Sequence, residues 1–305
     1  MSKHHDLIVI GTGITGLAAA RQACQLGLAT ATIESHFFGG LVINVNHLDG
    51  GIEGSGSDMA ANMMMEVSDL GAANINAAVS SIEREGELFA VHTDDGVHRA
   101  RAVIIASGAR LKRLGVPGEA DLIDLGVSQC ADCDGPMYKN KDVVVIGGGD
   151  SALQEAMVLA GYTRQVHLVH RGASFRARRD LVDRLAGHTN VSILWNTRID
   201  AVLGSQGVEG VRVRAASDAG ADHATREIAC AGIFAYVGLE PACAFVPAAA
   251  ARDAAGFLMT DAELQTAVSG LFAAGAVRSG YGGMLTHAIS EGVAAATSAR
   301  AFIHL

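Results

Sequence analysis

Short runs of hydrophobic residues that end in glycine recur along this chain and predict strands of a parallel sheet. Residues 7–10 form such a run directly before Gly11, and residues 143–146 form another directly before Gly147. A continuous apolar run of this length is typical of a strand that is buried on both faces. An alanine- and leucine-rich stretch follows each run, so the pattern predicts a strand, a tight turn and a helix twice over.

Both turns have the glycine spacing of a dinucleotide-binding loop. Glycine keeps such a turn tight, lets the backbone approach a pyrophosphate and lets the helix pack closely on the strand. The unpaired N–H groups at the helix N-terminus then face the phosphates. The candidate nucleotide-binding residues of the two loops are Gly11, Gly13, Ile14, Thr15 and Gly16 in the first, and Gly147, Gly149, Asp150, Ser151 and Ala152 in the second.

The two copies differ at the residue that should contact the ribose. The second strand of the first copy, residues 29–33, leads to Glu34, whose carboxylate can accept both ribose hydroxyls. At the matching position the second copy has His170 and Arg171, with Arg176 further on. A carboxylate repels a 2′-phosphate, whereas guanidinium groups bind it. We therefore expect FAD in the first copy and NADPH rather than NADH in the second, unless the arginines only form a solvated charged face.

The remaining strands predict how the copies are connected. Leu88–Thr93 and residues 97–100 form a predicted hairpin, and residues 103–109 form an apolar strand that returns to the first loop. Residues 232–238 are its counterpart in the second copy, and residues 271–275 with a helix from about 286 to 303 have no glycine fingerprint. The prediction is an α/β fold with two three-layer Rossmann-like domains: an FAD domain of residues 1–114 and 242–305, and an inserted NADPH domain of residues 115–241.

Cys130 and Cys133 have the C-x-x-C spacing of a pair that cycles between dithiol and disulfide. Half of a zinc site is the alternative, but the sequence has no second pair of ligands at similar spacing, so we expect no metal. The other cysteines, Cys24, Cys230 and Cys243, stand in apolar surroundings and are interpreted as buried small side chains.

Composition narrows the class of protein. The 305 residues suffice for two domains, and 50% hydrophobic with 18% charged residues is typical of a globular chain. A net charge of −9 argues against nucleic acid as a partner. No apolar run is long enough for a bilayer, and the N-terminus leads directly into a strand. We therefore expect no membrane partner, no signal peptide and a cytoplasmic location.

These segments together resemble the low-molecular-weight thioredoxin reductase family of homodimeric flavoproteins, from residue 7 to about residue 303. The segments that carry the resemblance are GTGITGLAAA, FGGLVINVNHLDG, ASGAR, GVPGE, CADCDG, VVVIGGGDSALQEA, VHLVHRGASFRA, GIFAYVGLEP and QTAVSGLFAAG.

The resemblance implies that electrons pass from NADPH through FAD to the Cys130–Cys133 disulfide, and then to thioredoxin or another disulfide substrate. It implies that Cys133 is the thiol near the flavin, that Cys130 exchanges with substrate, and that Asp134 is a general acid. A turn residue before glycine is the alternative reading of Asp134. The resemblance adds to the candidate FAD-binding residues Gly40, Leu41, Asn46, Ala106, Ser107, Gly108, Gly275 and Ala276.

The chain departs from the family pattern in four places. Asp132 replaces the usual threonine between the cysteines, and Gly172 replaces an arginine of the usual His-Arg-Arg. Ala276 replaces an aspartate, and Gly282, Gly283 and Met284 replace a flavin-contacting Arg-Gln-Ala. The first change places a second carboxylate beside the thiols, the second weakens the preference for NADPH over NADH, and the last two predict a remodelled FAD pocket.

Two alternatives to a reductase remain open at this point. Relatives on this scaffold use C-x-x-C to oxidise dithiols of small metabolites with oxygen as acceptor, but they typically lose the NADPH motifs. Arg171, Arg176 and the intact GGGDSA segment therefore favour a reductase. A degenerate flavoprotein that acts as a redox sensor is the alternative of another class, and the unchanged pair of cysteines counts against it.

Overall fold

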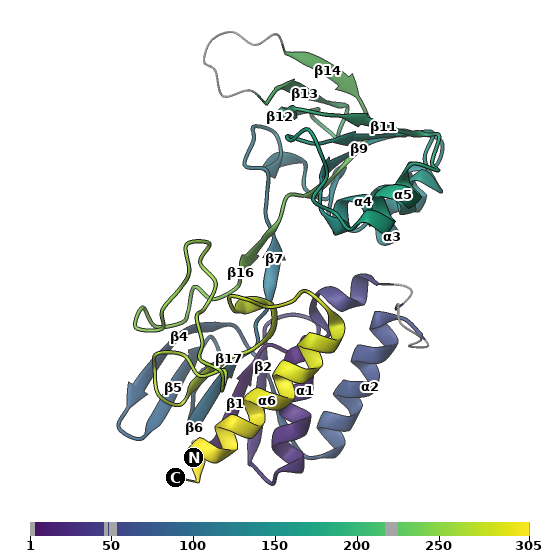
Figure 1. The fold of residues 1–305 in the computed structure, drawn as a ribbon. Coiled ribbons are helices and arrows are strands. Elements are labelled where there is room, and N and C mark those ends of the chain that lie inside the picture. Colours follow the sequence, from purple (N-terminus) through teal and green to yellow (C-terminus); the bar gives the residue numbers. More distant parts are fainter. Residues whose placement is uncertain (1–3, 46–47, 49–53, 217–224, 305) are drawn as a thin grey trace. The chain divides into compact units, whose positions relative to one another are not determined.

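A computed structural model describes residues 4–45, 48, 54–216 and 225–304. The candidate FAD-binding residue Asn46 therefore lies outside the described residues. The chain divides into two compact units: unit 1 comprises Met1–Arg110 and Glu240–Leu305, and unit 2 comprises Leu111–Leu239 (Figure 1). Among the described residues, no helix combines the length and the apolar character needed to cross a bilayer.

Unit 1 is built on a sheet with strand order β3-β2-β1-β6-β5-β4, and β17 pairs with β6. Strand β1 is parallel to both β2 and β6, whereas β4, β5 and β6 form an antiparallel meander. The strands are β1 (His4–Ile10), β2 (Thr30–Glu34), β3 (Ala73–Asn76), β4 (Val79–Glu85), β5 (Leu88–Thr93), β6 (Gly96–Ile105) and β17 (Leu271–Ala273).

Strand β6 unites two strands that the hydrophobic pattern predicts separately. Its first half pairs antiparallel with β5, with Ala100 opposite Phe89, and completes the predicted hairpin. Its second half pairs parallel with β1, with Ile105 opposite Ile10. The polar residue Arg101 does not interrupt the strand, because its exposed side chain points away from the buried residues on either side of it. One strand thus joins the hairpin to the nucleotide-binding sheet.

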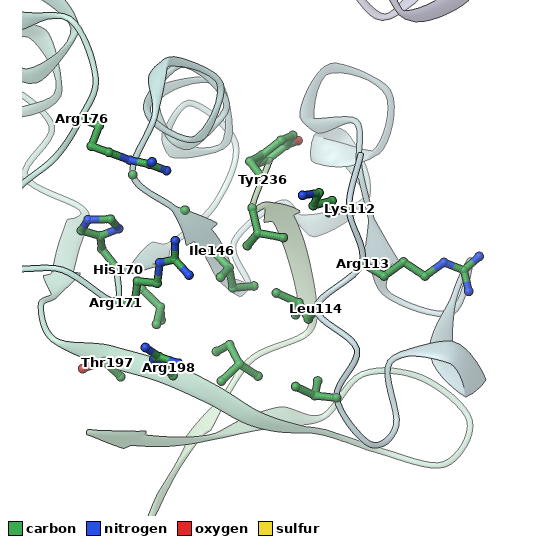
Figure 2. Close-up of a pocket in the computed structure, with 16 residues that line it drawn as sticks. Lys112, Arg113, Leu114, Ile146, His170, Arg171, Arg176, Thr197, Arg198 and Tyr236 are labelled. Carbon is green, nitrogen blue, oxygen red and sulfur yellow. The ribbon is translucent and has the colours of Figure 1, made fainter. Parts of the chain in front are cut away.

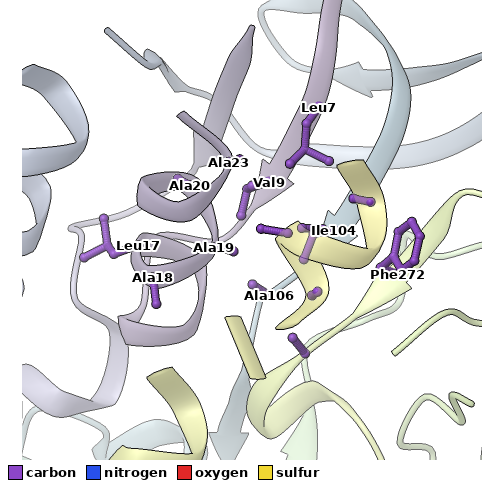
Figure 3. Packing of buried hydrophobic residues seen from close by; sticks show 14 of the residues in the cluster. Leu7, Val9, Leu17, Ala18, Ala19, Ala20, Ala23, Ile104, Ala106 and Phe272 are labelled. Atoms are coloured by element: carbon purple, nitrogen blue, oxygen red, sulfur yellow. The ribbon is translucent and has the colours of Figure 1, made fainter. Parts of the chain in front are cut away.

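Three helices pack against one face of this sheet: α1 (Ile14–Gln25), α2 (Gly56–Asp69) and α6 (Leu285–Ile303). Leu7, Val9 and Ile104 point from the strands into this core (Figure 3). Helix α6 crosses α1 so closely that a Cβ at Gly292 would lie 2.3 Å from the carbonyl oxygen of Thr15. The small residues along α1 and α6 therefore allow the C-terminal helix to complete the first nucleotide-binding unit.

Unit 2 contains a parallel sheet with strand order β11-β10-β9-β15-β8. Helices α4 and α5 pack on one face, and an antiparallel sheet of β12, β13 and β14 packs on the other. Its elements are β8 (Val127–Ser128), α3 (Ala131–Asp134), β9 (Asp142–Gly147), α4 (Asp150–Ala160), β10 (Gln165–Val169), α5 (Arg179–Leu185), β11 (Val191–Leu194), β12 (Thr197–Leu203), β13 (Gly210–Ala215), β14 (Arg226–Ala229) and β15 (Gly232–Tyr236).

The chain passes between the units twice, in neighbouring strands. Strands β7 (Ala109–Leu111) and β16 (Leu239–Pro241) pair as a small two-stranded sheet. The backbone N–H of Lys112 donates to the carbonyl of Gly238 over 2.9 Å on the unit 2 side. The predicted α/β fold, with one Rossmann-like unit inserted into another, is confirmed.

Candidate active site

The first glycine loop has no space for larger side chains at two of its three glycines. Gly11 follows β1 with φ at +99°, and a Cβ there would lie 2.4 Å from the carbonyl oxygen of Ala106. A Cβ at Gly16 would lie 1.9 Å from the carbonyl oxygen of Gly11. Gly13 differs, because it caps the N-terminus of α1 and its nearest neighbour would be 3.8 Å away. The loop is tight where it packs on the strand and open where a phosphate would approach.

A cavity of about 330 Å³ opens over this loop in unit 1. Most of the predicted FAD-binding residues line it, and Tyr281 and Leu285 line it without having been predicted. Gly16 and Gly275 lie behind the lining, and a Cβ at Gly275 would meet Thr15 Oγ1 at 2.4 Å. The predicted residues in the lining are Gly11, Gly13, Ile14, Thr15, Glu34, Gly40, Leu41, Ala106, Ser107, Gly108 and Ala276.

Glu34 is held beside the loop by hydrogen bonds to its carboxylate. Oε2 accepts the backbone N–H of Thr12 over 2.9 Å and the Thr12 hydroxyl over 3.2 Å. Oε1 accepts the N–H groups of Ser35 and His36 over 2.9 and 3.1 Å. The carboxylate therefore lies at the carboxyl end of β2 and on the cavity wall, where a ribose-binding group is expected. These features fit a dinucleotide with an unmodified 2′-hydroxyl.

Ala276 lines the same cavity, and the adjacent loop contains a carboxylate from another element. Glu291, on α6, accepts the backbone N–H of Gly275 at Oε2 over 2.7 Å. Its carboxylate also pairs with the guanidinium of Arg278. The sequence motif around Gly275 does not predict Glu291, because Glu291 lies on α6, 16 residues further along the chain. The loop that carries Ala276 is thus held by a residue of α6, which lies outside the Gly275–Ala276 motif.

The second glycine loop, in unit 2, packs against the ring of His170. A Cβ at Gly148 would lie 2.3 Å from His170 Cε1, and a Cβ at Gly172 would lie 2.9 Å from its Nε2. His170 is buried, and its Nε2 lies 3.0 Å from the carbonyl oxygen of Ser174. The ring also neighbours Phe175 and Trp195. The glycine at position 172, where the family usually has arginine, therefore also has a packing role, because a side chain there would press on the ring of His170.

A cavity of about 300 Å³ in unit 2 is lined by five basic residues from three segments of the chain. Arg171 and Arg176 were predicted for this site, and Arg198 on β12 was not (Figure 2). Lys112 and Arg113 also line it, but the Arg113 side chain points away from the other labelled residues in Figure 2. The lining includes Gly147, Gly148 and His170 as well. Such a concentration of positive charge favours an anionic ligand. Arg198 is distant from Arg171 in the sequence and joins it only in the folded unit, so the sequence around Arg198 does not predict a role in this cavity.

Four predicted residues of the second loop lie outside the lining of this cavity: Gly149, Asp150, Ser151 and Ala152. Gly149 caps α4, and a Cβ there would meet nothing within 4 Å. Asp150 instead accepts the backbone N–H of Arg178 over 2.8 Å. Ala152 is buried against the loop, 2.6 Å from where a Cβ of Gly147 would lie. Gly149 leaves the helix N-terminus open, as a phosphate-binding loop requires.

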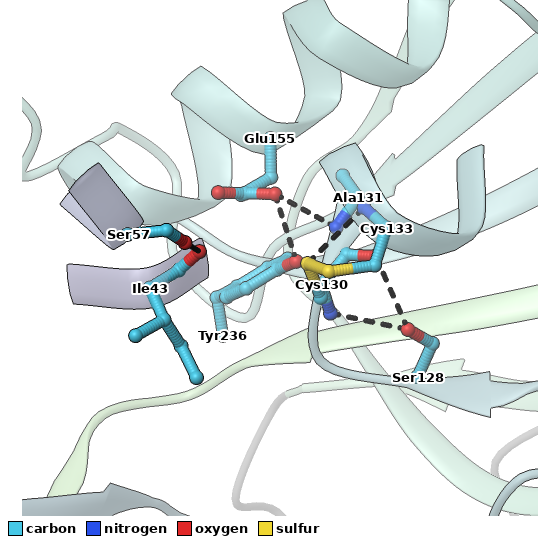
Figure 4. The surroundings of a disulfide bond; sticks show 8 residues. All are labelled: Ile43, Ser57, Ser128, Cys130, Ala131, Cys133, Glu155 and Tyr236. Atoms are coloured by element: carbon cyan, nitrogen blue, oxygen red, sulfur yellow. Dashed lines mark hydrogen bonds between the residues drawn. A yellow bond between two sulfur atoms is a disulfide. The ribbon is translucent and has the colours of Figure 1, made fainter. Parts of the chain in front are cut away.

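Cys130 and Cys133 form a disulfide at the short helix α3 (Figure 4). The backbone N–H of Cys133 donates to Cys130 Sγ over 3.2 Å, and the N–H of Cys130 donates to Ser128 Oγ over 3.1 Å. Cys133 is exposed, whereas Cys130 is half-buried. Of the other cysteines, Cys230 and Cys243 are buried as expected, but Cys24 is only partly buried. No other disulfide involves the described residues, and no three of their His, Cys, Asp and Glu side chains form a group that could hold a metal ion.

Helix α3, called the redox helix here because it follows Cys130 and contains Cys133, is hydrogen-bonded to the carboxylate of Glu155 on α4. Its Oε2 accepts the backbone N–H of Ala131 over 3.0 Å and the hydroxyl of Tyr236 over 3.1 Å. Burial raises the pKa of Glu155 above its usual value. Asp134 is half-buried, and its own backbone N–H donates to the carbonyl of Cys130 over 3.1 Å. The sequence pattern identifies Asp134 beside the pair but does not reveal Glu155.

Comparisons with known proteins agree with this arrangement. A family model described as pyridine nucleotide-disulphide oxidoreductase matches residues 5–294. The thioredoxin reductase of Treponema pallidum is 36% identical, over 99% of this chain and 98% of that protein. A 34.2 kDa protein in the rubredoxin operon of Clostridium pasteurianum is 33% identical, over 99% of this chain and 98% of its own length.

Solved structures give the same assignment. The thioredoxin reductase of Lactococcus lactis superposes with a TM-score of 0.92 at 31% identity, over 98% of this chain and 99% of that one. The thioredoxin reductase of T. acidophilum gives a TM-score of 0.89 at 28% identity, again over 98% and 99%. The chain therefore belongs to the pyridine nucleotide-disulphide oxidoreductase family, in its low-molecular-weight thioredoxin reductase branch, and is a flavin-dependent disulfide oxidoreductase.

Proposed function

We propose that this enzyme uses NADPH to reduce a disulfide substrate, with thioredoxin as the first substrate to test. The observation that carries the proposal is the Cys130–Cys133 disulfide in the same unit as a cavity lined by five basic residues. A separate cavity over the first glycine loop of unit 1 provides a second nucleotide site. When bound, the two nucleotides would supply a hydride donor and a redox relay to the disulfide.

Unit 1 is the proposed FAD-binding domain. Glu34 would accept the ribose hydroxyls, and the open N-terminus of α1 at Gly13 would face the pyrophosphate. The adjacent loop of Gly275 and Ala276 is braced by Glu291, so it can form a wall of the cavity without the usual aspartate.

Unit 2 is the proposed NADPH-binding domain. Arg171, Arg176 and Arg198 line one cavity, and guanidinium groups bind a phosphate dianion more strongly than they bind a neutral hydroxyl. This arrangement supports NADPH over NADH. In this proposal Arg198 contributes a guanidinium group that the segment following His170 lacks, since Gly172 stands where the family usually has arginine.

We assign the two thiols to successive steps of thiol–disulfide exchange. The Cys130 thiolate attacks one sulfur of the substrate disulfide and releases the other as a thiolate, which gives a mixed disulfide. Cys133 then attacks Cys130 Sγ, which re-forms the Cys130–Cys133 disulfide and releases the second substrate sulfur. Asp134 is the proposed proton donor to a departing thiolate. The substrate gains two electrons and two protons, and the enzyme dithiol loses them.

Cellular location and assembly complete the proposal. A homodimer follows from the family resemblance, and light scattering after gel filtration tests it. A cytoplasmic location is proposed from the acidic net charge and from the lack of a long apolar run in the sequence. Oxidation of small dithiols by oxygen and a non-enzymatic sensor role are not favoured, because the basic cavity is present and the thioredoxin reductases of Treponema pallidum and Lactococcus lactis match nearly the whole chain.

The decisive experiment is an anaerobic titration of the purified, FAD-loaded protein with NADPH, followed by addition of thioredoxin. Loss of flavin absorbance and then NADPH-dependent reduction of thioredoxin are expected. The Cys130→Ser variant should still show flavin reduction but no disulfide turnover, and Cys133→Ser should trap a mixed disulfide on Cys130. A protein that binds no FAD, or whose flavin is not reduced by NADPH, would contradict the proposal. A mixed disulfide trapped on the more exposed Cys133 in Cys130→Ser, with none trapped on Cys130 in Cys133→Ser, would reverse the roles of the two thiols.

A further inference from the structure

Glu155 is a partly buried carboxylate for which the proposed electron path has no role. It lies on α4, and its pKa is raised chiefly by burial. Tyr236, on β15, is 8% exposed and hydrogen-bonded to it. A partly buried acid usually has hydrogen-bonding partners, and its protonation state responds strongly to nearby charge.

Both partners of Glu155 bind the same oxygen. Oε2 accepts the Ala131 N–H over 3.0 Å and the Tyr236 hydroxyl over 3.1 Å. Ala131 directly follows Cys130 and is the first residue of α3. Figure 4 shows the Glu155 carboxylate, the Tyr236 hydroxyl and the Cys130–Cys133 disulfide gathered at this end of the helix. The carboxylate therefore ties the redox helix to the sheet and to α4 at the residue next to a reactive sulfur.

The groups around Glu155 push its protonation in opposite directions. Burial and the charge of Asp132, on α3, raise its pKa, whereas the hydrogen bonds from Ala131 and Tyr236 lower it. The pKa of the Tyr236 hydroxyl is raised chiefly by burial and then by the negative charge of Glu155. Among the described residues of unit 2, Tyr236 and Asp132 are thus the titratable neighbours that act on Glu155, together with the thiols formed on reduction.

We propose that Glu155 is a positioning residue that couples proton uptake to the reduction of the Cys130–Cys133 disulfide. Its carboxylate fixes the first peptide of the redox helix, and its charge opposes formation of a thiolate beside that peptide. Reduction adds two electrons and one proton to the disulfide, which gives a thiol and a thiolate. Glu155 then takes up a second proton from solvent, because the new negative charge favours its neutral form. The inference rests on the proposed function only in requiring that this disulfide be redox-active.

The coupling has a pH signature. In the pH range in which Glu155 is ionised beside the disulfide but neutral beside the thiolate, reduction takes up the extra proton. The equilibrium constant for reduction of the wild-type pair therefore falls more steeply with rising pH in that range. Glu155→Gln cannot take up this proton and has no charge. We expect its pair to be several-fold easier to reduce at the alkaline end and to lack the steep segment.

The experiment equilibrates the FAD-loaded protein with dithiothreitol redox buffers from pH 6 to pH 9, without NADPH. Alkylation and mass spectrometry then give the fraction of Cys130 and Cys133 that is reduced. Tyr236→Phe removes a hydrogen bond that lowers the Glu155 pKa, so the steep segment should move to higher pH. Asp132→Asn removes a charge that raises this pKa, so the segment should move to lower pH. Glu227→Gln removes an exposed, Arg212-paired carboxylate of the same unit and should leave the curve unchanged.

Parallel curves for the wild type and Glu155→Gln, within about twofold at every pH, would overturn the inference. Shifts of Tyr236→Phe and Asp132→Asn in the same direction would also contradict it. Those two variants keep the test decisive if Glu155→Gln fails to fold. Failure of the proposed function is seen separately, as absence of NADPH-dependent flavin reduction in the wild type.

Discussion

Arg278 and Glu291 form an ion pair with two hydrogen bonds, from Nε to Oε2 over 2.9 Å and from Nη2 to Oε1 over 2.7 Å. Their side chains are only 19% and 14% exposed, so solvent screens the pair weakly. The same Oε2 accepts the backbone N–H of Gly275 over 2.7 Å. One carboxylate on α6 thereby fixes the loop that lines the proposed FAD cavity, at the position where the chain lacks the family's aspartate.

Replacement of this carboxylate should weaken FAD retention. Glu291→Gln removes the charge opposite Arg278 and the strong acceptor of the Gly275 N–H, which should destabilise the fold by about 1–3 kcal/mol. We expect a lower melting temperature and less FAD per protein chain, measured by thermal denaturation and by flavin absorbance. Glu66→Gln breaks the exposed Arg21–Glu66 pair and should change neither quantity. FAD retention equal to that of the wild type would show that the pair does not brace the site.

Two adjacent glycines of the second loop should respond differently to an added methyl group. Gly148→Ala pushes against the packed ring of His170 and should lower stability by about 1–3 kcal/mol, as overpacking typically does. Gly149→Ala meets no protein atom within 4 Å, so it should fold normally but obstruct a bound pyrophosphate. Urea unfolding and the KM for NADPH measured on both variants separate the two effects. An unchanged KM for NADPH in Gly149→Ala would contradict the assignment of Gly149 to the phosphate, and equal stability losses would contradict the difference in packing.

Arg198 should discriminate between the two nicotinamide nucleotides. Arg198→Ala removes a guanidinium from the basic cavity, and loss of a charge-assisted hydrogen bond should raise the KM for NADPH about 10- to 100-fold. The KM for NADH should hardly change, because NADH lacks the 2′-phosphate. Arg214, directly opposite Arg198 in the ladder of β12 and β13, is absent from the lining of the cavity and provides the matched control in Arg214→Ala. An equal loss for both nucleotides would refute a role in phosphate recognition.

Cys230 should make stability depend on alkaline pH. Burial raises the pKa of its thiol from 9.0 to about 12. Above pH 9 the unfolded chain loses this proton while the folded chain keeps it, so stability falls by about 1.4 kcal/mol per pH unit until the folded thiol also ionises. Below pH 9 both states keep the proton and no such loss occurs. Urea unfolding at pH 8, 9 and 10 should show a smaller decline for Cys230→Ala, and identical slopes would contradict the prediction.

The repeated strand–glycine–helix pattern predicts the parts of the site that depend on local geometry. Gly11 and Gly16 follow their strand in the first copy, and the structure shows the close backbone contacts that make glycine necessary. Glu34 is likewise found at the carboxyl end of its strand. These features follow from sequence because the turn, its glycines and its strand are contiguous.

The features that sequence does not reveal depend on contacts between distant segments. Arg198 joins Arg171, and Glu155 reaches Ala131, only after the strands and helices of unit 2 have assembled. His170 has the position of a ribose-binding residue, but burial of its ring gives it a packing role that the position alone does not indicate. A side chain's partners cannot be inferred from its neighbours in the chain when those partners come from other elements.

The pairing of β7 with β16 means that unit 2 could be removed or replaced as a whole. Because unit 2 starts and ends in adjacent strands, it resembles a cassette whose two ends meet. Such a cassette can be cut out between residues 110 and 240, and a short linker can rejoin its host without stretching either one. The same geometry would let another domain be inserted into unit 1, so that the basic nucleotide cavity and the Cys130–Cys133 pair could be exchanged together while the proposed flavin site is kept.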